Sequence, residues 1–172
     1  MKNKITLPAI LTGLCAVCLF IGSIWPVKVA MSIAASFIIT VIVCECGHKY
    51  AWLSYVAVSV IAFLLIPKKM IVYVFILLFG FYPILKHYIE KLSKLTLEWI
   101  IKLLCFNTAL LIAYFVVNQV LIPWLDTELV RFIFKYIAAI IAVSEAMFVV
   151  YDLGLSYFVK IYYERIRSII KL

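Results

Sequence analysis

Long apolar runs separated by short polar stretches dominate the chain, and this pattern predicts six transmembrane helices. A bilayer core needs about 20 apolar residues in a helix, with roughly 17 to 25 as the useful range. Runs of about this length lie near residues 5–25, 27–45, 50–66, 69–85, 100–123 and 129–152. Proline falls at or near their edges, where it removes no interior helical hydrogen bond. The predicted fold class is therefore all-α, a polytopic membrane protein with one transmembrane domain over residues 1–172.

Two features of this pattern leave alternatives open. The first run has a basic start like that of a signal peptide, but it is long and further apolar runs follow, so we expect a retained first span. The third and fourth runs are short, and a hairpin that enters and leaves on one side of the membrane is an alternative to two full spans. Both versions leave the later topology unchanged.

Two segments have apolar residues at every third or fourth position with charges opposite, which predicts amphipathic helices. One is "LKHYIEKLSKLTLEW", from which we expect a helix over residues 86–99, and the other is the tail over residues 153–172. Basic amphipathic helices lie in the headgroup plane or dock on a partner helix.

Composition supports the membrane assignment and sets the expected orientation. Of the 172 residues, 68% are hydrophobic and 14% are charged, against about a quarter charged in an ordinary soluble domain. The net charge of +8 comes from basic residues scattered between apolar runs, without the dense stripe of a nucleic-acid surface. One side of the membrane would receive Lys2, Lys4, Lys49, Lys86, Lys91, Lys94, Lys102, Lys160, Arg165, Arg167 and Lys171, and the other Lys28, Lys68, Lys69, Arg131 and Lys135. The positive-inside rule puts the side with more Lys and Arg residues in the cytoplasm. Both termini lie on that side.

Polar residues inside the last two spans predict contacts between them, because an ionisable group at membrane depth needs a partner or a purpose. Helical rise puts Asn107 and Glu145 at similar depths and Lys102 with Asp152 at the cytoplasmic edge. With Glu45 and Lys86 on the same side, these residues make a candidate intramembrane polar network. Such bonds either hold the spans together or form a functional path or coupling contact.

The opposite side of the membrane has fewer polar residues. Asn118, with Trp25, Tyr73 and Trp124 nearby in the predicted topology, would line either a pocket for a mainly apolar ligand or a wetted rim. The chain contains no P-loop, HExxH or GxSxG motif, so we expect neither P-loop ATP hydrolysis nor an enzyme of these classes.

The stretch "VIVCECGHKY" contains residue types that zinc uses, but its spacing disfavours a metal site. On a helix Cys44 and Cys46 point to different sides, and "CAVC" in the first span, Cys15 and Cys18, lies too deep to share an ion with them. We interpret the stretch as a span leaving the membrane, with Gly47 breaking the helix. No metal or other cofactor is expected.

The first span contains "LPAILTGLCAV", in which Ala9 with Gly13, and Thr12 with Ala16, make two small-xxx-small steps that let another helix approach closely. With six spans in this length, the chain resembles the substrate-binding S-component of energy-coupling factor vitamin transporters. The stretches "GHKYAWLSYVAVSVIAFLLIPKK" and "LLFGFYPILKHYIEKL" resemble uncharacterised small bacterial membrane proteins often grouped with these S-components.

The resemblance implies a multi-pass protein of the bacterial plasma membrane that captures a vitamin or similar small molecule at the outer face. It also implies a transmembrane coupling subunit that meets the first helix, and two ATPase subunits that supply the energy. The alternative is a non-transport scaffold similar to the rod-shape-determining MreD family. If the protein is a scaffold, we expect a helix bundle that binds no ligand and acts through its helical surfaces.

Overall fold

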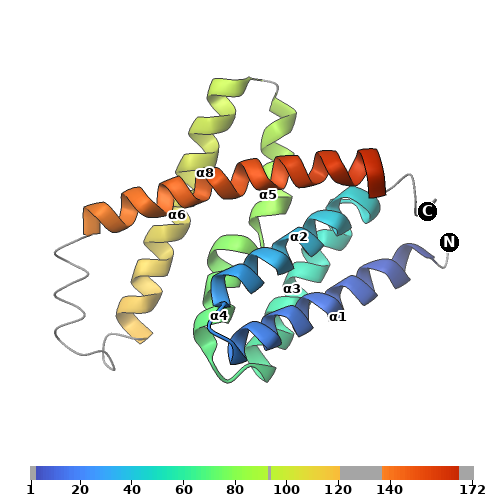
Figure 1. Cartoon of the computed structure of the whole chain (residues 1–172), viewed down its shortest axis with the longest axis horizontal. Coiled ribbons are helices and arrows are strands. Elements are labelled where there is room, and N and C mark those ends of the chain that lie inside the picture. Colours follow the sequence, from blue (N-terminus) through green and yellow to red (C-terminus); the bar gives the residue numbers. More distant parts are fainter. Residues whose placement is uncertain (1–2, 93, 121–136, 167–172) are drawn as a thin grey trace. The chain divides into compact units, whose positions relative to one another are not determined.

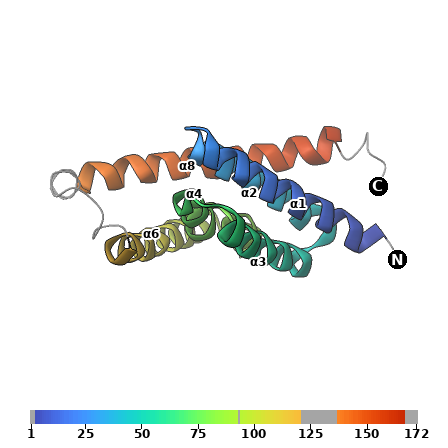
Figure 2. The same cartoon turned by 90° about the horizontal axis from the view of Figure 1, so that it is seen from below.

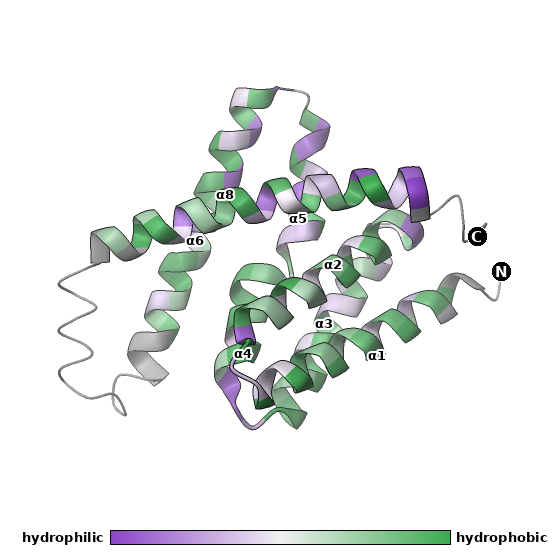
Figure 3. Cartoon of the chain, viewed as in Figure 1, coloured by the Kyte–Doolittle hydropathy of each residue, from purple (hydrophilic) through white to green (hydrophobic). Residues whose placement is uncertain are grey.

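The structure is a computed structural model that describes residues 3–92, 94–120 and 137–166 (Figure 1). These residues are 93% helical and contain no strand. Among them, six helical stretches are long and apolar enough to cross a membrane: Ile5–Ile24, Lys28–Cys46, His48–Leu65, Lys69–Leu92, Leu95–Val116 and Ile141–Arg165. Apolar residues cover most of the helical ribbon (Figure 3). The prediction of an all-α polytopic membrane protein is confirmed.

The contacts divide the chain into two compact units, Met1–Trp99 and Ile100–Leu172. We describe each unit by itself. The prediction of one transmembrane domain over the whole chain stays a prediction.

The first unit contains the helical segments α1 to η2. They are α1 (Asn3–Ile24), α2 (Lys28–Cys46), α3 (His48–Leu65), α4 (Lys69–Val74), the π-helical turn η1 (Phe75–Phe79), α5 (Tyr82–Ile89) and the 3₁₀ turn η2 (Glu90–Leu92). Helices α1 and α2 form an antiparallel hairpin, and α3 and α4 lie on one side of it (Figure 2). Helix α2 contacts α1, α3, α4, η1 and α5, so it is the centre of this unit.

Small and hydroxyl-bearing residues let the neighbours of α2 approach it. Ser32, Ala35 and Ser36 are fully buried on α2. The Ser32 hydroxyl donates to the carbonyl of Lys28 at 3.0 Å and the Ser36 hydroxyl to that of Ile33 at 2.7 Å. Each polar group is therefore satisfied on its own helix, which matters in a bilayer that has no water to do so.

Close packing of α1 on α2 depends on Gly22. A Cβ added there would lie 2.6 Å from the Cβ of Met31 on α2 and 2.6 Å from the Cδ1 of Ile71 on α4. Real Cβ contacts are not this short, so any side chain at this position requires the helices to move apart. The Cys15 thiol donates to the carbonyl of Ala35 across the same interface at 3.4 Å.

Gly47 separates α2 from α3, as the sequence predicts. Its φ of 83° is left-handed, a conformation that glycine adopts without the steric cost of a Cβ. One residue is therefore enough to end α2 at Cys46 and begin α3 at His48.

The fourth helical run is irregular where it passes α3. Between α4 and α5 lies the π-helical turn η1, in which the backbone N–H of Gly80 donates to the carbonyl of Phe75. The Tyr55 hydroxyl of α3 donates to the carbonyl of Ile76 in this turn at 3.0 Å. A π-turn displaces the normal helical hydrogen bonds, and here the tyrosine side chain satisfies one of the affected carbonyls.

The second unit contains most of α6 (Leu95–Val120), then α8 (Ile137–Ile161) and the π-helical turn η4 (Tyr162–Ile166). Helix α6 crosses α8 near the middle of both (Figure 1). Helix α8 continues into η4 without interruption.

One predicted helix is wrong. No single amphipathic helix spans residues 86–99, because one helical run ends at Leu92 and the next begins at Leu95. The apolar spacing of three and four residues continues across this break, so periodicity alone did not reveal it. The helical run that contains the fourth predicted span continues to Leu92, and the run that contains the fifth begins at Leu95.

Helix α8 runs through residue 152 to Ile161, so the boundary between the last span and the tail stays a prediction that no helix break marks. Gly154 is the only helix-weakening residue there, and one glycine costs about 1 kcal/mol, too little to end a long helix. Pro8, expected near a helix edge, lies inside α1. Residues 121–136 and 167–172, which include parts of the predicted fifth and sixth spans and of the tail, lie outside the described residues.

Candidate functional site

The polar residues predicted to join the last two spans meet where α6 crosses α8. We call this contact the α6–α8 seam. It consists of Lys102, Phe106 and Asn107 on α6, and Glu145, Phe148 and Asp152 on α8. On α8, Glu145, Phe148 and Asp152 recur at spacings of three and four, which puts them on one face, and on α6 Phe106 and Asn107 follow Lys102 by four and five residues. Both predicted pairs are present.

The first pair is a buried ion pair. The Lys102 ammonium donates to Oδ2 of Asp152 at 3.0 Å, and the two residues are 4% and 2% exposed. Removing two charges from water costs several kcal/mol per ion, and only a close partner offsets much of that cost. Each charge is therefore the close partner that the other needs.

The second pair is a weaker contact. The Asn107 amide donates to Oε1 of Glu145 at 3.3 Å and to the carbonyl of Leu103 at 3.0 Å. Glu145 is half-buried. Within the seam, Asn107 thus bonds both to its own helix and to the carboxyl group of Glu145 on α8.

An aromatic stack lies between the two polar contacts. The rings of Phe106 and Phe148 have centroids 4.2 Å apart and planes 14° apart, and Phe148 is buried. The sequence analysis did not single out Phe106. The signal that was overlooked is its position four residues after Lys102, matched by Phe148 four residues before Asp152. The stack separates the ion pair from the amide contact.

The small-residue face of α1 is exposed in its first half. Ala9 and Gly13 are exposed, and no atom would lie within 4 Å of a Cβ added at Gly13. Thr12 and Ala16 are half-buried, and the Thr12 hydroxyl donates to the carbonyl of Pro8 at 2.7 Å. The described helices of this unit leave the Ala9–Gly13 step uncovered, so another helix can approach it.

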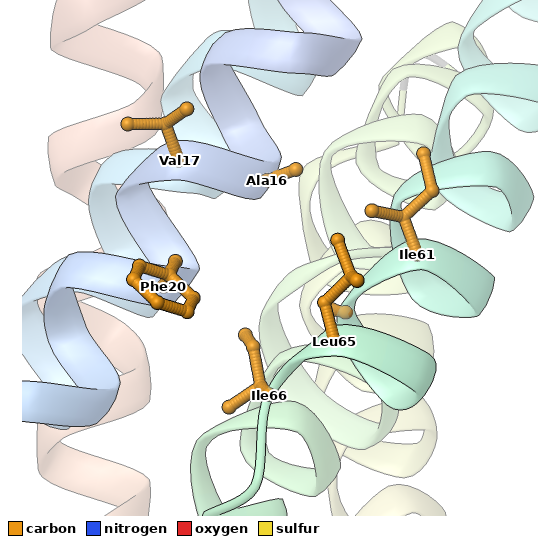
Figure 4. A pocket seen from close by; sticks show the side chains of 7 residues that line it. Ala16, Val17, Phe20, Ile61, Leu65 and Ile66 are labelled. Carbon is orange, nitrogen blue, oxygen red and sulfur yellow. The ribbon is translucent and has the colours of Figure 1, made fainter.

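An apolar groove lies between α1 and α3 (Figure 4). Its volume is about 180 Å³. It is lined by Ala16, Val17, Phe20, Ile61, Ala62, Leu65 and Ile66. Ala16 and Ala62 are the small members of this set, and they leave the space that the larger side chains border. We call this the α1–α3 groove.

The four residues predicted for an outer pocket are only partly described. Trp25 is 65% exposed in the turn after α1, and Tyr73 is half-buried on α4. The side chain of Asn118, in the last turn of α6, and the whole of Trp124 lie outside the described residues. The pocket that these four residues would form stays a prediction.

The two remaining network residues lie in the first unit. Glu45 is half-buried in the last turn of α2. Lys86 is buried, and its ammonium lies 2.8 Å from Oε1 of Glu90 one turn later on the same helical run. This contact lies within one helical run, whereas the Lys102–Asp152 contact joins two helices.

The structure brings His48 of α3 and His87 of α5 together. The rings of His48 and His87 have centroids 4.5 Å apart, and the Tyr88 ring lies 4.5 Å from that of His48. The buried Nδ1 of His48 has no hydrogen-bond partner among the described residues. Within that same part of the chain, no three or more His, Cys, Asp or Glu residues gather as metal ligands would.

Comparisons with known proteins give no relative for this chain. No protein-family model matches it, and neither the curated proteins nor the solved structures contain a match. Its function must therefore be argued from its own residues.

Proposed function

We propose that this protein is the substrate-binding membrane subunit of a bacterial importer of the energy-coupling factor type. In this role it captures a vitamin or similar small molecule at the outer face, and partner subunits supply ATP-driven energy. The observation that carries the proposal is the exposed Ala9–Gly13 step of α1. A small-residue face on the first helix is what a coupling subunit would need for close contact.

The α6–α8 seam supports the same proposal in a second way. An importer that reorients in the membrane needs helices that keep their mutual arrangement, and a buried ion pair is lost only at a high cost in free energy. The Lys102–Asp152 contact gives the second unit such a fixed crossing. The plasma-membrane location and the cytoplasmic termini are parts of this proposal, and a reporter fused to the C-terminus tests them.

The partner contact is tested at Gly13. In Gly13→Leu the added side chain meets no atom of this chain within 4 Å of its Cβ, so the protein should fold. We expect the variant to lose the ATPase activity that co-purifies with the wild-type protein from its native membrane. Leu14→Phe, on a neighbouring exposed face of α1, is the matched control and should keep it. Equal loss in both variants, or in neither, argues against a coupling subunit on this face.

The ligand is tested separately. Denaturing the purified protein and analysing the released small molecules by mass spectrometry should identify one compound at a molar ratio near one. Repeated absence of any such compound favours the scaffold. One observation favours that second candidate: the α1–α3 groove is lined by apolar side chains and is smaller than the roughly 300 to 1,000 Å³ of ordinary ligand pockets.

A further inference from the structure

The α1–α3 groove is the starting point for an inference that goes beyond the proposed function. All its lining residues belong to stretches apolar enough to cross a membrane, or to the turn directly after one. Its side chains therefore face hydrocarbon instead of water. Ala62 and Ile66 are 1% exposed, whereas Val17, Phe20 and Leu65 are largely exposed. A buried floor with exposed walls makes a channel that is open to the bilayer.

The volume of the groove limits which molecules can bind in it. About 180 Å³ is too little for a drug-sized ligand, and a helix about 10 Å across would not enter it. A slender, flexible apolar chain fits both the size and the chemistry. In a bilayer, the molecule that offers such a chain is a lipid.

The groove runs toward a turn that carries two lysines. It includes Leu65, the last residue of α3, and Ile66, and two residues later comes Lys68. Two residues span at most about 7 Å, so the ammonium of Lys68 can reach the mouth of the groove. This turn is one of the hydrophilic places among the apolar helices of the first unit (Figure 3).

The two lysines of this turn differ in what they contact. The Lys69 ammonium donates to the carbonyl of Phe63, and it lies 4.8 Å from the centre of the Phe63 ring. Lys68 is exposed, and among the contacts of the described residues it has no hydrogen bond or ion pair. One cation is therefore held by α3, while the other is available to an anion beside the groove.

We propose that the α1–α3 groove binds one acyl chain of an anionic phospholipid, whose phosphate pairs with Lys68. The apolar lining accounts for the chain, and the available ammonium accounts for the preference for a negative headgroup. This lipid would be a bound component of the first unit, separate from any small molecule that the protein transports.

The headgroup contact is tested by native mass spectrometry of the full chain in detergent micelles. Phosphatidylglycerol is titrated in, with phosphatidylcholine of the same chains as the zwitterionic control. We expect the wild type to bind one phosphatidylglycerol more tightly than phosphatidylcholine. Lys68→Gln should weaken phosphatidylglycerol binding about fivefold, the effect of one lysine near a lipid surface. Lys69→Gln, the matched control, should change it less than about twofold. Equal effects of the two variants, or equal binding of the two lipids, would overturn the proposal.

The chain contact is tested by filling the groove. Ala16→Phe, at a half-buried lining position, should remove the bound phosphatidylglycerol. Ala142→Phe, at an exposed position of α8, should leave it in place, and circular dichroism checks that both variants are folded. If Ala16→Phe keeps the lipid but loses a co-purifying protein, the groove belongs to a partner helix and the proposal fails.

A measurement on the wild type covers the case in which Ala16→Phe does not fold. Phosphatidylglycerol with a photoactivatable acyl chain should cross-link to peptides that contain Val17, Phe20 or Leu65. Cross-links spread evenly over α6 and α8 as well would show an unspecific lipid shell, and would overturn the proposal.

Discussion

The two units hold their helices together in different ways. In the first, α1 and α2 approach through Gly22 and through buried serines that satisfy their hydroxyls on their own helix. In the second, α6 and α8 are joined by side chains that reach across, namely the Lys102–Asp152 ion pair and the Asn107–Glu145 contact. Lipid tails are as apolar as leucine, so burial of apolar surface does not drive helices together in a bilayer. Close packing and polar contacts take the place of apolar burial in holding helices together. Each unit relies mainly on one of them.

This difference predicts where the protein tolerates substitution. A unit held by close packing is sensitive to added volume. A unit held by polar contacts is sensitive to the loss of one partner, because the other is left unpaired at membrane depth. Four substitutions test this comparison.

The largest effect is expected at the ion pair. Asp152→Asn leaves Lys102 as a buried charge without its counter-ion, and should lower the free energy of unfolding by about 3 to 5 kcal/mol. Unfolding in mixed detergent micelles, followed by circular dichroism, measures this. The double exchange Lys102→Asp with Asp152→Lys should recover much of the loss. If it folds stably but abolishes activity, the pair has a functional role beyond holding the helices.

The next effect is expected at the α1–α2 contact. Gly22→Ala places a Cβ 2.6 Å from the Cβ of Met31, and overpacking of this kind costs about 1 to 3 kcal/mol. Gly13→Ala is the matched control, because its Cβ meets nothing within 4 Å. It should be neutral, or stabilising by up to about 1 kcal/mol through helix propensity. The same unfolding experiment compares them, and a Gly22→Ala variant as stable as Gly13→Ala would show that this interface is loose.

A smaller effect is expected at Asn107. Replacing it with Leu removes the amide that donates to Glu145, and hydrogen bonds between membrane helices average about 0.6 kcal/mol, with a maximum near 1.7. Thr108→Val is the control, since the Thr108 hydroxyl donates to the carbonyl of Leu104 on its own helix at 2.8 Å. Equal losses in thermal stability for the two variants would mean that the contact across the helices adds nothing.

The smallest effect is expected at Tyr55. Tyr55→Phe removes the hydroxyl that donates to the carbonyl of Ile76 and should cost about 0.6 kcal/mol. The comparison between the units requires this loss to be smaller than that of Gly22→Ala, because packing dominates the first unit. A larger loss at Tyr55 would show that polar contacts matter equally in both units.

The sequence alone predicted much of the candidate site, for a physical reason. Lys102 with Asp152, and Asn107 with Glu145, were predicted as pairs because a charge or amide at membrane depth has few partners available. Phe106 was missed although it stacks on Phe148, because an apolar residue in an apolar span has no such restriction. The approach of His48 to His87 was missed because it depends on how α3 packs near the end of α5.

What the sequence determined by itself is the set of membrane-spanning helices and the break at Gly47. Apolar length and a single left-handed glycine are local properties, and the bilayer converts the first directly into a helix. What only the tertiary structure decided is which small residues pack against other helices of the chain. Gly22 is packed against two helices, whereas Gly13 lies open. The α1–α3 groove likewise exists because Ala16 and Ala62 belong to helices that meet. Both depend on which faces of the helices come together, and hydropathy does not encode this in a chain that is apolar on nearly every face.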